Sequence, residues 1–455
     1  MGGNIRSWGA VWLGLGLLAV AAGPVRAEEG EAAPAADEAR VSEDFSLHGQ
    51  ATSTYQVKPD FPSAYQSGNS LDHKFQARDS NTVTLFLGAR LWRGAEAYVD
   101  PELSEGYGLS HTYGLAGFSN GEAQKGGSLW PKYYPARYYL KQVIGLGGEQ
   151  EWIEGGANQL AGYQDVSRLT LVGGGFAASD FFQTNSYAND PRANFTNWAL
   201  WESAAWDVPG NQKGYTRGLY AELNQADWAL RYGAFAVPNS LNASDVTFGG
   251  DRTLSQAVEI EGRGSLAGRP GKLKLMGFYT RAAMGDYRAA LRLVAQGADA
   301  AAALQRTRQP GHEKFGFAAT AEQEIADELG LFARLSWNDG RNEEWGFTDA
   351  DASLAGGASL KGGRWGRPDD TVGLGAAVNT ITAAHRAFLA AGGSTILLGD
   401  GGLSYGHEVD LEAYYAARLL PFLTLTGDYQ LIDNPGYNQD RGPAQVFGGR
   451  LHAEF

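Results

Sequence analysis

The sequence predicts a transmembrane antiparallel β-barrel, all-β, with short turns at one end and long loops at the other. From residue 45 onward, segments of alternating apolar and polar residues are separated by turn-rich stretches. Glycine is abundant (63 of 455 residues) and 12% of residues are aromatic. After the first 27 residues, no segment approaches the roughly 20 apolar residues that a spanning helix needs. Strands would therefore have to make any span of a membrane.

The alternation is clearest in "TVTLFLGARLW" at residues 82–92. Successive side chains of a strand point to opposite faces, so the leucines and valine fall on one face, and Arg90 falls on the other with threonines. After a tight turn at Arg93–Gly94, residues 95–103 resume the pattern. Similar segments recur at 136–146, 217–223, 228–235, 257–263, 272–280, 329–337, 408–418 and 422–432. With weaker candidates the total reaches about 14 to 18 strands, which one barrel can hold.

The connections between these segments alternate in length. A long link at 58–81 precedes the turn at Arg93–Gly94, and a very long link at 104–135 precedes Gly147–Gly148. Near the end, a short turn at 419–421 precedes a long link at 433–443. A soluble sandwich would also alternate, with its apolar faces in a dry core. Short turns opposite long loops favour a membrane barrel, whose apolar faces contact lipid and whose charged faces line a wet lumen.

Two Ala-rich stretches, 287–307 and 382–393, have a helical pattern. Both are too short or too polar to span a membrane, so we expect helices within loops. A helix that plugs the lumen is the alternative.

The N-terminal region predicts export. An apolar run at 8–23 follows Arg6, and small residues precede Ala27, as in a cleaved signal peptide at 1–27. Residues 28–44 form an acidic, Ala/Pro-rich stretch that predicts a flexible tail, and 45–455 form the barrel. The net charge of -14 would become -16 without Arg6 and Arg26, which argues against nucleic acid as a partner. There are no cysteines to form disulfides.

Four stretches, at 100–125, 137–149, 384–393 and 428–455, resemble the carbohydrate-selective porin family typified by OprB. The likeness extends over nearly all of 45–455. It implies a barrel of about sixteen strands with short periplasmic turns and long extracellular loops in the outer membrane of a Gram-negative bacterium. It also implies facilitated diffusion of glucose-type mono- or small oligosaccharides. The C-terminal Phe455 resembles the signal that the outer-membrane assembly machinery reads.

The polar faces supply candidate sugar contacts. A neutral sugar needs oriented hydrogen-bond partners for its hydroxyls and flat aromatic faces for its C–H surfaces. Binding must also be weak enough for release. The pore-lining candidates are Arg90, Glu96, Tyr98, Asp100, Glu102, Arg137, Tyr139, Lys141, Glu408, Asp410, Asp428 and Arg450. The alternative is that these charges only solvate a wide pore.

The very long link at 104–135 could fold inward and narrow the pore, or stay outside as an external loop. Its candidate constriction residues are Glu105, Asn120, Glu122 and Lys125. Aromatic residues with membrane-facing parity predict girdles at the lipid–water interfaces. They are Tyr138, Trp228, Tyr232, Tyr415 and Phe455.

Two other functions compete with a sugar channel. A general or anion-preferring diffusion porin would carry a ring of one charge sign, whereas the polar faces here mix signs. An outer-membrane lipid hydrolase would need a Ser–His pair, such as His407 with a distant serine. The histidines lack metal-ligand spacing, so we expect no catalytic residue, metal or cofactor. The expected partners are carbohydrate, outer-membrane lipids and the assembly machinery, in a monomer or homotrimer.

Overall fold

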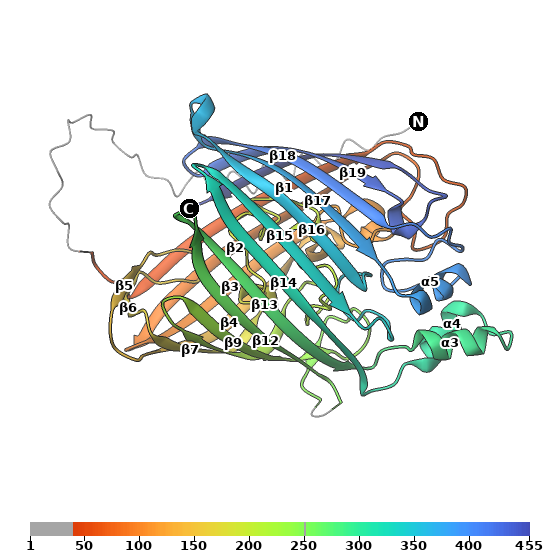
Figure 1. Cartoon of the computed structure of the whole chain (residues 1–455), viewed down its shortest axis with the longest axis horizontal. Coiled ribbons are helices and arrows are strands. Elements are labelled where there is room, and N and C mark those ends of the chain that lie inside the picture. The colour runs from red at the N-terminus through yellow and green to blue at the C-terminus, as the bar shows by residue number, and fades with distance from the viewer. Residues whose placement is uncertain (1–39, 250–251) are drawn as a thin grey trace.

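The computed structural model describes residues 40–249 and 252–455, and its centre is a closed antiparallel barrel (Figure 1). Sixteen strands follow one another around it in chain order, and β1 pairs with β20 to close the ring. They are β1 (Phe45–Lys58), β2 (Gln76–Trp92), β3 (Ala95–Gly106), β4 (Ser128–Gly145), β7 (Arg168–Phe176), β8 (Thr216–Asn224), β9 (Trp228–Phe235), β12 (Leu254–Leu266), β13 (Arg269–Ala282), β14 (His312–Ala326), β15 (Leu329–Asn338), β16 (Ala352–Gly362), β17 (Arg367–Thr380), β18 (Glu408–Leu420), β19 (Leu423–Asp433) and β20 (Ala444–Glu454). The predicted fold is confirmed.

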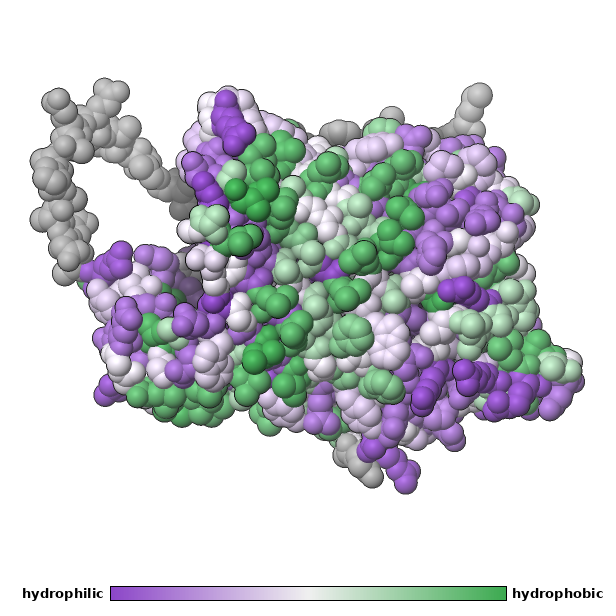
Figure 2. Space-filling model, viewed as in Figure 1, coloured by the Kyte–Doolittle hydropathy of each residue, from purple (hydrophilic) through white to green (hydrophobic). Residues whose placement is uncertain are grey.

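The apolar faces of the strands point out of the barrel. Leu85, Leu140 and Leu374 expose 40%, 56% and 62% of their surface, whereas Thr84 beside Leu85 and Tyr139 beside Leu140 are buried inside. Figure 2 shows apolar residues gathered over the strand wall and polar residues concentrated toward the two ends. A sandwich would bury the leucines instead, so this arrangement excludes it.

Short turns and long loops lie at opposite ends of the barrel, as the sequence predicts. In the turns at Arg93–Gly94 and at 267–268, Gly94 and Gly268 take φ values of +75° and +78°, which glycine adopts readily. The long loops are shorter than expected, because the strands extend further than their alternation indicates. The first loop is 59–75 instead of 58–81, and the second is 107–127 instead of 104–135.

One connection at the short-turn end departs from the prediction. Gly147–Gly148 does not join two barrel strands directly, because residues 146–167 form a separate hairpin of β5 (Gln150–Ile153) and β6 (Gly162–Asp165). In Figure 1 this hairpin lies at the end of the barrel opposite the helices. A Gly–Gly pair is a turn signal, but it gives no information about a hairpin that follows it.

The predicted helices lie in loops at the long-loop end (Figure 1). The first stretch forms two helices, α3 (Tyr287–Val294) and α4 (Ala300–Thr307), because Gly297 takes a φ of +92° between them. The second forms α5 (Ala383–Ala390). No helix in residues 40–249 and 252–455 has the length and apolar character to cross a bilayer.

The end of the chain closes the barrel. The backbone N–H of Phe455 donates to the Gly49 carbonyl, and the Gly49 N–H donates to the Phe455 carbonyl, at 3.0 and 3.1 Å. A Cβ on residue 49 would lie 2.7 Å from the Phe455 ring, so the ring packs closely over Gly49. The Phe455 side chain stays half exposed on the outer surface.

The structure describes little of the predicted tail. The signal peptide at 1–27 and tail residues 28–39 lie outside the described residues. Residues 40–44 have no regular secondary structure, and Glu43 and Asp44 contact the barrel.

Candidate functional site

Strands β3 and β4 carry a ladder of charged and aromatic side chains on the inner wall. Their register places Glu96 opposite Lys141 and Tyr98 opposite Tyr139. Lys141 Nζ lies 2.5 Å from Glu96 Oε2, and the two tyrosine rings are 5.2 Å apart. All four face inward, as their parity predicts, and the predicted patch is therefore assembled on adjacent strands.

Arg137 joins this wall to the inward-folded loop 177–215. Its Nε and Nη2 donate to the two carboxylate oxygens of Asp180 at 2.8 and 2.6 Å, a bidentate geometry that fixes the guanidinium plane. Its Nη1 lies 3.5 Å from Asp100 on β3. The guanidinium also lies 5.5 Å from the centre of the Tyr215 ring.

Loops 107–127 and 177–215 bring further charges to the same region. Glu102 of β3 lies 3.8 Å from Lys125 and 3.3 Å from Arg192, measured from oxygen to nitrogen. Glu122 lies 3.3 and 2.8 Å from the same two cations. The two acidic and two basic side chains are nearly buried, which strengthens their interaction relative to water.

Two stacked tyrosines lie beside these charges. Tyr134 of β4 and Tyr215 stack with ring centres 5.5 Å apart. Lys213 lies over Tyr134 at 5.8 Å, and Lys125 lies over Tyr215 at 5.3 Å. Such cation–aromatic contacts orient the charged groups over flat apolar faces. We define the constriction cluster as Glu102, Glu122, Lys125, Tyr134, Arg137, Arg192, Lys213 and Tyr215.

The surroundings of two loop residues in the constriction cluster shift their pKa values. Burial alone would raise the pKa of Glu122, but the positive charges of Arg192 and Lys125 outweigh it and lower that pKa to about 2. Burial lowers the pKa of Lys213, against the opposing effect of Glu102. Glu122 is therefore held in its ionised form, which accepts hydrogen bonds. Lys213 is the basic residue of the constriction cluster whose charged form is disfavoured by burial.

Three tryptophans of loop 177–215 pack in the interior of the barrel. Trp198, Trp201 and Trp206 are buried, and Trp198 stacks on Phe347 at 5.5 Å. Among the described residues, none accepts a hydrogen bond from any of the three indole Nε1–H groups. Buried indole N–H groups usually have a partner, so three free donors in one loop are unusual.

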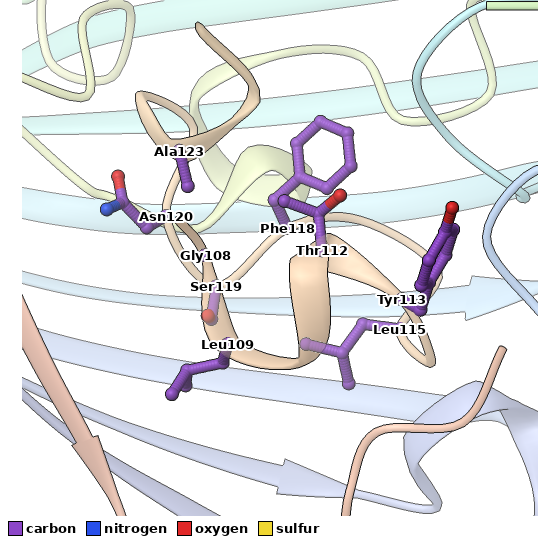
Figure 3. Close-up of a pocket in the computed structure, with 9 residues that line it drawn as sticks. All are labelled: Gly108, Leu109, Thr112, Tyr113, Leu115, Phe118, Ser119, Asn120 and Ala123. Carbon is purple, nitrogen blue, oxygen red and sulfur yellow. The ribbon is translucent and has the colours of Figure 1, made fainter. Parts of the chain in front are cut away.

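Loop 107–127 encloses a cavity of only about 10 Å³ (Figure 3). Its lining includes Leu109, Phe118 and Asn120, from both limbs of the loop. This is close to the smallest space that holds one water molecule, so the cavity does not hold a sugar.

Several predicted pore-lining residues support loops rather than face water. Arg450 is 1% exposed and donates to the carbonyls of Pro191 and Asn194 at 2.7 and 2.9 Å. Glu408 accepts from the Ala116 and Gly436 N–H groups at 2.8 and 2.6 Å. These loops enter the barrel, and their buried backbone groups need partners. The expectation of open water beside these side chains is therefore wrong.

Asp410 and Asp428 lie on the same wall. Asp410 is 1% exposed and accepts from Asn379 at 3.0 Å, and Asp428 accepts from Gln430 at 3.1 Å. Both pairs connect neighbouring residues of the barrel wall itself.

Arg90 and Glu105 lie away from the constriction cluster. Arg90 is at the short-turn end and donates to the carbonyls of Glu43 and Ala161. Glu105 belongs to β3, not to the loop, and lies on the outer face, where it accepts from Asn81 at 3.3 Å. Of the loop residues predicted to narrow the pore, Glu122 and Lys125 belong to the constriction cluster.

Asn120 is also inside the barrel and donates to Ser80 at 2.9 Å. The aromatic residues predicted to face the membrane are all exposed on the outside: Tyr138, Trp228, Tyr232, Tyr415 and Phe455.

Sequence reasoning missed Tyr134 of β4. It also missed Arg192, Lys213, Tyr215 and the three tryptophans, which lie in loop 177–215, between β7 and β8. Its unusual length and the spacing "WALWESAAW" at 198–206 were signals that could have singled it out.

Comparison with known proteins identifies the chain. Residues 70–455 match the model of the carbohydrate-selective porin, OprB family. The chain belongs to this family. No curated protein matches its sequence.

One solved structure supports the same fold. The high-pH structure of OprB from Pseudomonas putida has a TM-score of 0.66 and 17% identity over 90% of this chain and 94% of that one. The outer membrane channel DcaP of Acinetobacter baumannii covers 90% of this chain and 97% of its own at 10% identity, with a TM-score of 0.48.

The OprB family membership and the barrel together make the protein an outer-membrane sugar porin of a Gram-negative bacterium, a channel rather than an enzyme. His407, proposed for the hydrolase alternative, lies 3.3 Å from the Tyr405 hydroxyl.

Proposed function

We propose that glucose-type mono- or small oligosaccharides cross the barrel through the constriction cluster. The observation that carries the proposal is the combination, within one region, of buried charges of both signs with two stacked tyrosines. Arg137, Arg192 and Lys213 would donate to sugar hydroxyls, and Glu102 and Glu122 would accept from them. The Tyr134 and Tyr215 faces would receive the C–H surface of the ring.

The mixture of signs favours a neutral solute over an anion. Four basic side chains, Lys125, Arg137, Arg192 and Lys213, lie near four acidic ones. The acidic ones are Asp100, Glu102, Glu122 and Asp180. An anion-preferring pore would need an excess of positive charge at its narrowest part.

Swelling of proteoliposomes tests the proposal. We expect glucose to enter faster than amino acids of similar size, and Lys213→Met to reduce the glucose rate severalfold. Lys213 donates to Ser104 at 2.9 Å, and its loss removes one sugar donor without removing a strand pairing. Lys361→Met, at an exposed position near a turn, is the matched control. Equal swelling rates for glucose and amino acids would contradict the proposal and indicate a general diffusion porin.

We also propose that residues 1–27 are removed as a signal peptide and that the assembly machinery reads the terminal strand with Phe455. The apolar run at 8–23 supports the first step, and the exposed Phe455 ring supports the second. Outer-membrane lipids would contact the apolar outer wall. A monomer and a homotrimer both remain compatible with this wall.

A further inference from the structure

We infer that the β5–β6 hairpin forms a second narrow section of the channel, at the periplasmic end and in series with the constriction cluster. The inference rests on the proposed sugar path. In the part of the chain that the structure describes, the other connections at this end contain two to four residues, whereas this one comprises 146–167. A barrel does not need that length to reverse direction.

The tip of the hairpin lies inside the barrel. Leu160 is 1% exposed and belongs to the buried apolar cluster that includes Tyr98 and Tyr139. Its N–H donates to the Tyr98 hydroxyl at 3.2 Å. Asn158 Nδ2 donates to Asp100 Oδ2 at 2.8 Å. The tip therefore occupies part of the inner polar ladder that the sequence predicts as a sugar-contact surface.

The depth of the tip can be estimated from the strand. Asp100 is five residues into β3, which begins at Ala95, so the tip reaches roughly 17 Å along the strand. Glu102 of the constriction cluster is the next inward-facing residue of the same strand. The hairpin tip therefore lies directly next to the constriction cluster on the path of a solute toward the periplasm.

Residues before β1 hold the hairpin in place. The Glu43 N–H donates to the Ala161 carbonyl at 2.9 Å, and the Ala161 N–H donates to the Glu43 carboxylate at 2.8 Å. Arg90 of β2 donates to the carbonyls of both residues. Arg40 lies 5.6 Å from the centre of the Trp152 ring on β5. These contacts on both hairpin limbs indicate a fixed part of the pore wall.

Asn158 also positions the sugar site. Asp100 receives the Asn158 amide and lies 3.5 Å from Arg137, whose guanidinium belongs to the constriction cluster. Arg137 in turn binds Asp180 of loop 177–215. The hairpin from the periplasmic end and the loop from the extracellular end are thus connected through Asp100 and Arg137. We assign Asn158 as a positioning residue for Arg137.

Single-channel recording with glucose added to one side at a time tests the inference. We compare the wild-type porin with a variant in which residues 149–166 are deleted, so that Gly147–Gly148 becomes the turn. Narrow sections in series add their resistances, and the constriction cluster remains in the variant, so ion conductance should rise by up to about twofold. The association rate of blocking glucose added on the periplasmic side should also rise, while the association rate of glucose added on the extracellular side stays within error. Unchanged conductance and unchanged periplasmic entry would overturn the inference.

A tip variant covers the case in which the deletion does not fold. Asn158→Gly combined with Leu160→Gly removes both inward contacts and leaves the hairpin strands in place. It should raise periplasmic glucose entry and weaken glucose block by removing support from Arg137. Ala157→Ser, at an exposed position on the same tip, is the control. Equal behaviour of the tip variant and this control would overturn the inference.

A disulfide tests whether the section is fixed. A Cβ on Gly162 would lie 3.6 Å from Ser42 Cβ, which suits a disulfide in Ser42→Cys/Gly162→Cys, and the natural chain has no cysteine. The same conductance before and after reduction supports a fixed section. A conductance rise on reduction would instead indicate a mobile lid and overturn it. If wild-type channels show no glucose block at all, the proposed sugar path fails instead.

Discussion

The ionisation of Glu122 makes the stability of the inward-folded loop 107–127 dependent on pH. Burial opposes its ionisation, but Arg192 and Lys125 lower its pKa from 4.5 to about 2. A lowered pKa stabilises the folded loop fully above the ordinary value, and this stabilisation is lost as the pH falls through the folded value. We expect the free energy that holds the loop in its folded position to fall by on the order of 3 kcal/mol between pH 4.5 and 2.

Pepsin, which is active in this pH range, can report the attachment of that loop. Cleavage of wild-type protein within 107–127 should accelerate steeply as the pH falls. Glu122→Gln should be cleaved at a rate that changes little with pH, because it lacks the titrating group. Glu105→Gln is matched in chemistry but lies on the outer face, and it should behave like wild type. A steep dependence in Glu122→Gln would assign the effect to other carboxylates.

Among elements, loop 177–215 depends on strand side chains that lie far away in sequence. Arg450→Met leaves the buried carbonyls of Pro191 and Asn194 without their donor, at about 1–3 kcal/mol each. The loop should loosen, so conductance and current noise should increase. The barrel itself should stay folded, since strand pairing is unaffected, and its heat-modifiable migration in gels checks this. Arg364→Met, in an exposed turn, should change neither property.

The elements also show what could be predicted from the sequence. Alternation has a period of two, so it revealed both the strands and the side of each residue, as at Glu96 and Tyr98. It could not reveal that loop 177–215 fills the lumen. The contacts that decide this, such as the Asn197 N–H to Glu412 at 2.9 Å, join residues more than 200 positions apart. Parity also fails across β-bulges: the bulges where β4 pairs with β3 put Tyr134 and Arg137 on the same face.

At the scale of the whole molecule, Phe455 takes part in closing the barrel through its backbone hydrogen bonds with Gly49 of β1. Phe455→Ala keeps the backbone pairing with Gly49 but removes the exposed ring. We expect a severalfold lower amount of heat-modifiable barrel in the outer membrane, because the proposed assembly signal is lost. Immunoblots of membrane fractions measure this amount. Phe447→Ala removes a similarly exposed ring from the same strand, and an equal loss in both variants would assign the effect to general hydrophobicity.

Loop 177–215 has a mechanical consequence for the barrel. It binds β3 through Arg192 and Glu102, β15 through Arg334 and the Gln183 carbonyl, and β20 through Arg450. β15 lies across the ring from β3, and β3 and β20 are separated by β1 and β2. A β-barrel without internal contacts flattens under lateral pressure, but a barrel whose strands are linked through an internal loop keeps a round cross-section. Sugar flux through this barrel should therefore stay constant when the surrounding lipids are exchanged for longer or stiffer ones.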